Sequence, residues 1–198
     1  MKIEPVLSAL DAASDAALKR LFGLMRIQSI STDPAFAAEC RKAAEWLVDD
    51  LTSIGFDASV RDTAGHPMVV AHHDGEGPHV LFYGHYDVQP VDPLDRWEGD
   101  PFEARLKTGA DRSQEIFGRG SADDKGQLMT FVEACRAYKT AHGVLPCRVT
   151  ILFEGEEESG SPSLKPFLQA NAGELKADVA LVCDTNMWDR ETPAISTS

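Results

Sequence analysis

Apolar positions near the start of the chain recur at the three- and four-residue steps that are typical of amphipathic helices. The first such run predicts a helix from about Val6 to Met25, and its apolar face carries Leu7, Leu10, Leu18, Leu21 and Leu24. The second run predicts a helix that ends at Gly55, and its apolar positions are Ala37, Cys40, Ala44, Leu47, Leu51 and Ile54. Asp33 and Pro34 precede this second run and suit an N-cap and a first-turn proline.

Beyond Gly55 the pattern changes to short apolar or alternating runs, which indicate strands. Strands are predicted at 57–62, 67–74, 79–84, 147–154 and 178–184, with a short hairpin at 103–107 and 115–117. The runs 79–84 and 178–184 are almost wholly apolar, so both are predicted to be buried, and the first to lie inside the sheet. Helices are predicted at 125–140 and 163–169, and a loop at 88–102. Strands that alternate with helices indicate an α/β fold with a mixed, largely parallel central sheet flanked by helices.

Length and composition narrow the classes of function. A chain of 198 residues can bury a substantial core, and it shows neither an internal repeat nor a linker. The formal charge of −13 argues against a nucleic-acid partner, because phosphate binding requires clustered Lys and Arg. No apolar run is long enough to span a membrane, and the N-terminus does not resemble a signal peptide. Scattered cysteines without metal-site spacing suggest free thiols, so we expect a cytoplasmic protein with no membrane partner.

Polar residues follow each of the predicted parallel strands. His85 and Asp87 follow the strand at 79–84, a run of acids follows 147–154, and Asp184 follows 178–184. Asp123 lies in the turn before the third long helix. Because functional groups of open α/β sheets collect at the carboxyl ends of the strands, these side chains are expected to gather at one edge. Nitrogen and oxygen donors without thiolates suit Zn²⁺, Mn²⁺ or Co²⁺.

The run Glu154 to Glu158 contains four carboxylates and has two interpretations. Taken alone, it is most simply a solvated acidic loop. If partly buried, however, its carboxylates would repel one another, and a divalent cation would remove that penalty. The other acid-bearing strand ends favour the cation. Asp87, two residues after His85, is placed to hold the ring of a metal-bound histidine in one orientation.

Other chemistries fit less well. The glycine-rich GRGSADDKG segment is neither a P-loop nor a dinucleotide fingerprint, and no serine lies in a GxSxG elbow. A pair of glycosidase-type carboxylates is conceivable, but it would leave His85 and Asp184 without a role.

Four motifs together resemble a known family. They are GHYDVQP (84–90), FGRGSADDKG (117–126), EGEEESGS (154–161) and VCDT (182–185). In this order they resemble the zinc exopeptidases, which include carnosine dipeptidase, acetylornithine deacetylase, succinyl-diaminopimelate desuccinylase, aminoacylase and glutamate carboxypeptidase. The stretch 84–106 is most similar to the dipeptidase branch.

The resemblance implies two Zn²⁺ ions, with Mn²⁺ or Co²⁺ as alternatives. His85 and Asp184 would bind one ion, Asp123 would bridge both, and Glu158 would bind the second. The catalytic residues would be Glu157 as general base and Asp87 as the partner that orients His85. The resemblance also implies a cis peptide bond between Asp123 and Asp124.

It further implies parts that the chain lacks, because the family has one more histidine ligand and an inserted lid domain. No histidine follows His142, and the final segment, 193–198, contains no closing helix or strand. Residues 1–198 are therefore expected to be the truncated N-terminal portion of a di-zinc catalytic domain, without the lid that forms the homodimer in the complete protein. The fragment itself is expected to be nearly inactive.

The resemblance implies a hydrolase of dipeptides. Two alternatives stay open: an amidohydrolase of N-acyl amino acids, or a non-catalytic domain of the same fold.

Overall fold

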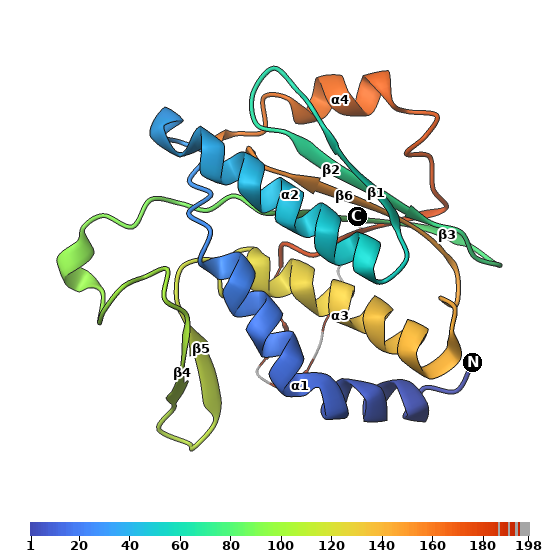
Figure 1. Cartoon of the computed structure of the whole chain (residues 1–198), viewed down its shortest axis with the longest axis horizontal. Helices are drawn as coiled ribbons and strands as arrows, with labels where there is room; N and C mark the ends of the chain where they lie inside the picture. Colours follow the sequence, from blue (N-terminus) through green and yellow to red (C-terminus); the bar gives the residue numbers. More distant parts are fainter. Residues whose placement is uncertain (186, 190, 193, 195–198) are drawn as a thin grey trace.

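The chain folds into three layers around one five-stranded sheet (Figure 1). The computed structural model describes residues 1–185, 187–189, 191–192 and 194. The sheet has the order β1-β2-β6-β3-β7. Its strands are β1 (Asp57–Arg61), β2 (Met68–His73), β3 (His79–His85), β6 (Arg148–Glu154) and β7 (Val179–Val182). β3 pairs in parallel with β6 and β7, whereas β1 and β2 add antiparallel strands, so the predicted mixed α/β sheet is confirmed.

Helices cover both faces of this sheet, as Figure 1 shows. Three long helices, α1 (Glu4–Met25), α2 (Ala37–Ser53) and α3 (Lys125–His142), pack on one face, and the short α4 (Leu164–Ala170) packs on the other. All four predicted helices are present within a few residues of their expected bounds. The Asp33 side chain accepts a hydrogen bond from Ala35 N at 2.9 Å and so caps a 3₁₀ turn, Pro34–Phe36, that leads into α2.

The hydrophobic core lies on both sides of the sheet. Leu24, Leu51 and Leu128 from the three long helices pack with Phe82 and Ile151 on one face. On the other face a smaller cluster of Met68, Val70, Leu152 and Leu175 receives side chains from α4. Apolar burial on both faces holds the central strands, and hence their carboxyl ends, in fixed register.

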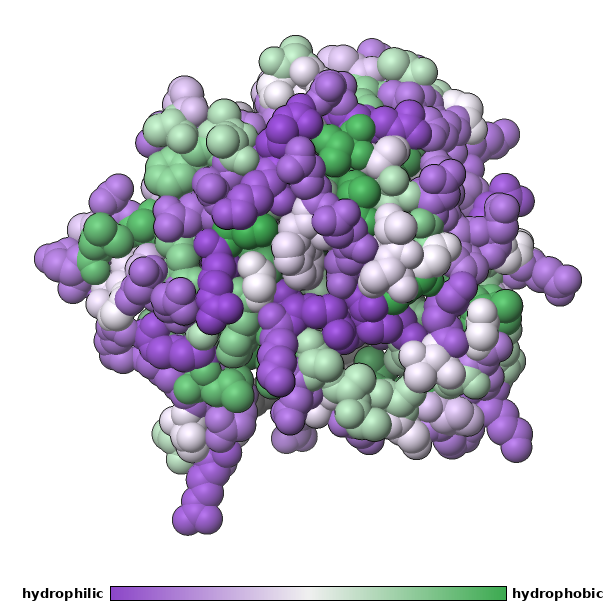
Figure 2. All heavy atoms as spheres, in the orientation of Figure 1, coloured by the Kyte–Doolittle hydropathy of each residue, from purple (hydrophilic) through white to green (hydrophobic). Residues whose placement is uncertain are grey.

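A long loop and a separate hairpin lie beside the main sheet. The predicted loop contains a 3₁₀ turn, Leu94–Arg96, and a cis Asp92–Pro93 bond. It leads into β4 (Arg105–Thr108) and β5 (Gln114–Phe117), which form the predicted hairpin as their own two-stranded sheet. The face of the molecule seen in Figure 2 is predominantly polar.

The prediction that the strand at 178–184 is buried is wrong. In the described part of the chain β7 pairs on one side only, with β3, and all four of its residues are exposed, Val182 to 58%. An apolar run resembles an interior strand whether or not anything covers it, because its sequence carries no information about its neighbours. β3, in contrast, lies between two strands as predicted.

Two further expectations concern the cysteines and the membrane. All four cysteines are free thiols, with Cys40 and Cys135 buried and the other two partly exposed. Among the described residues, every helix is too short or too polar to cross a bilayer. The terminal segment 193–198, on which the expectation of a truncated domain partly rested, falls almost entirely outside the described residues.

Candidate metal centre

The predicted site residues lie at the carboxyl edge of the parallel half of the sheet. His85 is the last residue of β3, the acidic run continues from β6, and Asp184 follows β7. Asp123 comes from the turn that precedes α3. The parallel register aligns His85 directly with Glu154, so these strands end at the same level. Sheet topology therefore brings together residues that are far apart in the sequence.

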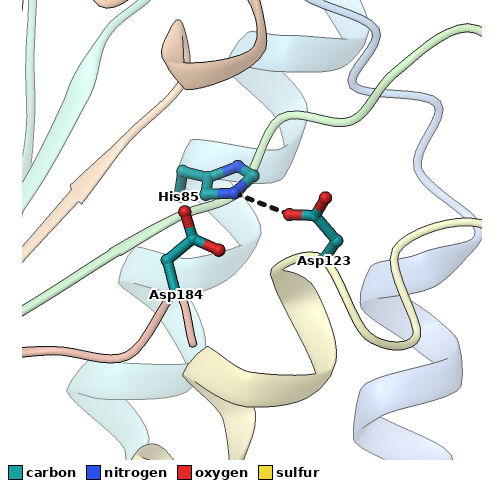
Figure 3. A group of neighbouring side chains, drawn as sticks. All are labelled: His85, Asp123 and Asp184. Carbon is teal, nitrogen blue, oxygen red and sulfur yellow. Dashed lines mark hydrogen bonds and ion pairs between the residues drawn. The ribbon is translucent and has the colours of Figure 1, made fainter. Parts of the chain in front are cut away.

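Three of these side chains form a cluster with the spacing of metal ligands. One ligand atom from each of His85, Asp123 and Asp184 lies within 4.8 Å of the others, and Figure 3 shows both carboxylates turned toward the ring. His85 Nε2 is 3.0 Å from Asp123 Oδ1. The histidine is fully buried, whereas the Asp123 side chain is 60% exposed. The cluster is thus anchored on the protein side and open on the other.

Asp87 fixes the orientation of the His85 ring. Both side chains are fully buried, and His85 Nδ1 lies 3.3 Å from Asp87 Oδ1 and 3.2 Å from the Asp87 carbonyl oxygen. Because Nδ1 faces these two acceptors, its proton is held there and Nε2 points toward Asp123 and Asp184.

The same carboxylate also holds the acidic turn. Asp87 Oδ1 accepts a hydrogen bond from Glu157 N at 3.2 Å, and Asp87 Oδ2 accepts one from Glu158 N at 3.1 Å. One buried carboxylate therefore links the histidine at the end of β3 to the turn that follows β6.

Glu157 and Glu158 occupy different surroundings. Glu157 Oε2 lies 4.0 Å from His85 Nε2, and burial followed by the charges of Asp184, Asp87 and Asp123 raises the pKa of Glu157. Glu158 Oε2 accepts a hydrogen bond from Gln89 Nε2 at 2.6 Å. Within the described part of the chain, Glu158 is not one of the three clustered ligands, but burial and the charge of Asp123 raise its pKa.

The bond between Asp123 and Asp124 is cis, as the resemblance implied. Asp124 stands at the N-cap position of α3, but its side chain turns away from the helix and accepts a hydrogen bond from His85 N at 3.0 Å. Its other oxygen, Oδ1, is buried and has no hydrogen-bond partner among the residues that the structure describes. Burial raises the pKa of Asp124 to about 7. Asp124 thus holds the main chain of His85 in place through this hydrogen bond.

Electrostatics favours a positive charge at the centre. Burial alone would lower the pKa of His85, but the hydrogen bond and charge of Asp87, with the charges of Asp124 and Glu157, raise it to about 10. In the metal-free chain His85 is therefore protonated at neutral pH. A cation with nitrogen and oxygen preference fits the same set of donors, since it compensates the surrounding carboxylates as that proton does.

A pH dependence of metal affinity follows. A cation that binds His85 Nε2 must displace its proton, so affinity for zinc is expected to rise by about tenfold per pH unit between pH 6 and 8. The measurement is a competition titration against a chelator of known affinity at three pH values. A zinc affinity that does not change with pH would contradict the protonated state of His85.

Sequence reasoning missed several buried polar residues around the centre. Glu154 is fully buried and accepts hydrogen bonds from the hydroxyls of Tyr83 and Ser161, and burial raises its pKa. Glu156 is also buried and bonds to backbone outside its own turn. In a run of four acids, no local signal separates the inward-facing members from Glu158, the member that is predicted to be a ligand. The role of Asp124 could have been suspected from the sequence, because it lies next to Asp123 and directly before a predicted helix.

Comparison with known proteins agrees with the geometry. A family model described as Peptidase family M20/M25/M40 matches residues 81–197. A Cys-Gly metallodipeptidase of Schizosaccharomyces pombe is 30% identical over 99% of this chain and 43% of its own length. A succinyl-diaminopimelate desuccinylase of Thioalkalivibrio sulfidiphilus is 30% identical over 73% of this chain and 38% of its own length.

A solved structure extends the match to the fold. The crystal structure of human carnosine dipeptidase 1 superposes with a TM-score of 0.83 at 26% identity, and the match covers 94% of this chain and 41% of that one. The chain thus spans roughly two fifths of the length of these relatives.

Proposed function

This chain belongs to peptidase family M20/M25/M40, and from that premise we propose that it supplies the metal-binding half of a two-zinc dipeptidase. The observation that carries the proposal is the cluster of His85, Asp123 and Asp184, with ligand atoms within 4.8 Å of one another. A Cys-Gly metallodipeptidase and a Beta-Ala-His dipeptidase are among the proteins that this chain is similar to, which supports a small peptide as the substrate. Residues 1–198 would form the N-terminal portion of the catalytic domain, and the complete protein would form a homodimer through its lid.

Each site residue has a proposed role. His85 and Asp184 would hold one ion, Asp123 would lie between the two, and Glu158 would hold the second. Mn²⁺ or Co²⁺ would suit the same nitrogen and oxygen donors. When bound, the ions supply a coordinated water of lowered pKa and polarise the scissile carbonyl. Asp87 keeps His85 Nε2 directed at the site through the contact at His85 Nδ1.

Glu157 is the proposed general base. Its Oε2 lies 4.0 Å from His85 Nε2, and its side chain is 37% exposed, so it can meet both the site and a substrate. Burial and neighbouring carboxylates raise its pKa, which moves the carboxyl toward the range in which it can take a proton and return it to a leaving amine. Glu158, at the next position, has the separate task of a ligand.

A second candidate function is supported by one of the relatives. The similarity to a succinyl-diaminopimelate desuccinylase favours N-acyl amino acids as alternative substrates. Both reactions cleave an amide bond, and the same general base and ligands would serve either one. The choice depends on contacts with substrate groups away from the scissile bond.

The test is zinc content per chain. We expect about one zinc to remain after dialysis against trace zinc, and His85→Ala to lose it. His72→Ala is the matched control, because His72 is a partly exposed histidine that bonds to Thr150 and Glu174 away from the site. Zinc retained by His85→Ala, or lost equally from His72→Ala, would contradict the proposed ligands.

Substrate choice requires a protein of the relatives' length. Such a protein should hydrolyse dipeptides faster than N-succinyl and N-acetyl amino acids, and Glu157→Gln should lose about 10²–10⁴-fold in kcat. Since the chain spans 43% of the metallodipeptidase, the 198 residues alone are expected to turn over slowly or not at all. Equal turnover by Glu157→Gln would rule out Glu157 as the base.

A further inference from the structure

Glu156 differs from its acidic neighbours in where its side chain goes. It is 4% exposed, whereas the side chain of Glu157 is 37% exposed. Glu156 Oε1 accepts a hydrogen bond from His66 N at 3.0 Å, and Oε2 accepts one from Ser163 N at 3.1 Å. A buried carboxylate is costly unless such charge-assisted bonds compensate it, and here both oxygens are used.

The backbone of Glu156 holds the turn that carries Glu157 and Glu158. Its carbonyl oxygen accepts hydrogen bonds from Ser159 N at 3.1 Å and from Ser161 N at 2.8 Å. The same carbonyl accepts from the Ser159 hydroxyl at 3.1 Å. The main-chain carbonyl of Glu156 therefore stabilises the turn itself, and its side chain bonds the turn to the loop that contains His66.

The loop between β1 and β2 is shaped to receive the Glu156 carboxylate. A Cβ on Gly65 would lie 1.6 Å from Glu156 Oε1, so only glycine allows the loop this close. The loop is stabilised on its own side, because Thr63 Oγ1 accepts from Gly65 N at 3.0 Å and donates to His66 O at 2.7 Å. The Glu156 carboxylate therefore packs against a loop that has its own stabilising hydrogen bonds.

A closed ring of contacts connects this loop back to the metal centre. His66 Nε2 bonds to Ser31 O at 3.1 Å, and the neighbouring Ser29 hydroxyl donates to Tyr86 O at 2.7 Å. Tyr86 is followed by Asp87, whose carboxylate accepts the amides of Glu157 and Glu158. Two buried carboxylates, Asp87 and Glu156, thus both bond to this turn or to the segments beside it.

We propose that Glu156 is a positioning residue for the catalytic turn: its buried carboxylate, bonded to His66 N and Ser163 N, holds Glu157 and Glu158 where the metal centre needs them. The positioning role is inferred from these contacts, whereas its importance for catalysis rests on the proposed function. Glu156→Gln would keep the shape but offer one acceptor to two N–H donors, and its NH₂ group would face a donor. One hydrogen bond must then be lost.

The test uses the 198-residue chain without metal. Glu156→Gln removes the second acceptor, and Gly65→Ala displaces the unchanged carboxylate from the other side. Gly75→Ala is the control for a clash elsewhere, because its Cβ would lie 2.3 Å from the Cys147 carbonyl oxygen, at the opposite end of the strands. Amide hydrogen exchange at Glu157 and Glu158 is read residue by residue by NMR, together with the thermal midpoint of each variant.

Exchange at these two amides should quicken by about tenfold or more in Glu156→Gln and Gly65→Ala. In Gly75→Ala it should stay within about twofold of wild type, even where the thermal midpoint falls. Unchanged exchange in the first two variants, or an equal rise in Gly75→Ala, would overturn the proposal. Zinc content of the wild-type chain tests the proposed function separately, because the amide measurement needs no metal.

Discussion

An Asp87→Ala variant is expected to lose about 3–5 kcal/mol of unfolding free energy, the cost of breaking a buried charged pair from one side. Asp87 is fully buried, and three donors converge on it: His85 Nδ1, Glu157 N and Glu158 N. Alanine would leave the two amides without this acceptor and would leave His85 Nδ1 with only the main-chain carbonyl of residue 87, at 3.2 Å. Since domains are stable by only about 5–15 kcal/mol, this single change would remove a large share.

The loss at Asp87 should also reach the metal centre. With the carboxylate gone and only the main-chain carbonyl left at Nδ1, the His85 ring is held less firmly, and loss of such a partner typically lowers metal affinity by about 10–100-fold. Urea unfolding measures the first effect, and chelator competition by the folded fraction measures the second. Asp74→Ala, at an exposed aspartate, is the control and should change neither quantity. A loss below about 1 kcal/mol would mean that the Asp87 hydrogen bonds contribute little net stability.

The sequence was informative where periodicity and strand order decide the outcome. The apolar runs predicted every strand of the main sheet within a few residues, because alternation and burial leave a direct pattern. The strand-end rule then placed His85 and Asp184 together, since β3 and β7 are parallel and end at a common edge, and the turn before α3 brings Asp123 to the same place. The first prediction needs only the pattern within each run, and the second needs only the order and direction of the strands.

Contacts between residues that are distant in the sequence could not be predicted from it. The run of four acids does not reveal that Glu156 points toward Gly65 while Glu157 points toward His85, because the turn alone sets these directions. Exposure of β7 was missed for a related reason: its sequence describes the strand but not what lies beside it. Residues that support a site from behind are found by contacts, whereas ligands are found by chemistry and spacing.

Adding a side chain at Gly155, in the backbone next to the metal centre, should also lower the unfolding free energy strongly. A Cβ on Gly155 would lie 2.2 Å from the Tyr86 hydroxyl oxygen and 2.4 Å from the ring carbon that bears it. Tyr86 cannot yield, because it is fully buried and its hydroxyl donates to Pro67 O at 2.5 Å. Gly155→Ala is therefore expected to cost about 3 kcal/mol, the upper range for overpacking a dense interior.

A double-mutant cycle separates this clash from a general effect of alanine at position 155. Tyr86→Leu is destabilising by itself, but it removes the ring that the new Cβ would strike, so Gly155→Ala should cost about 1 kcal/mol or less in that background. Gly173→Ala is the control, because a Cβ there meets nothing within 4 Å in the described part of the chain. Additive losses in the cycle would show that Tyr86 is not the obstacle. A strongly non-additive cycle would show that position 155 must be glycine because of Tyr86, the residue between His85 and Asp87.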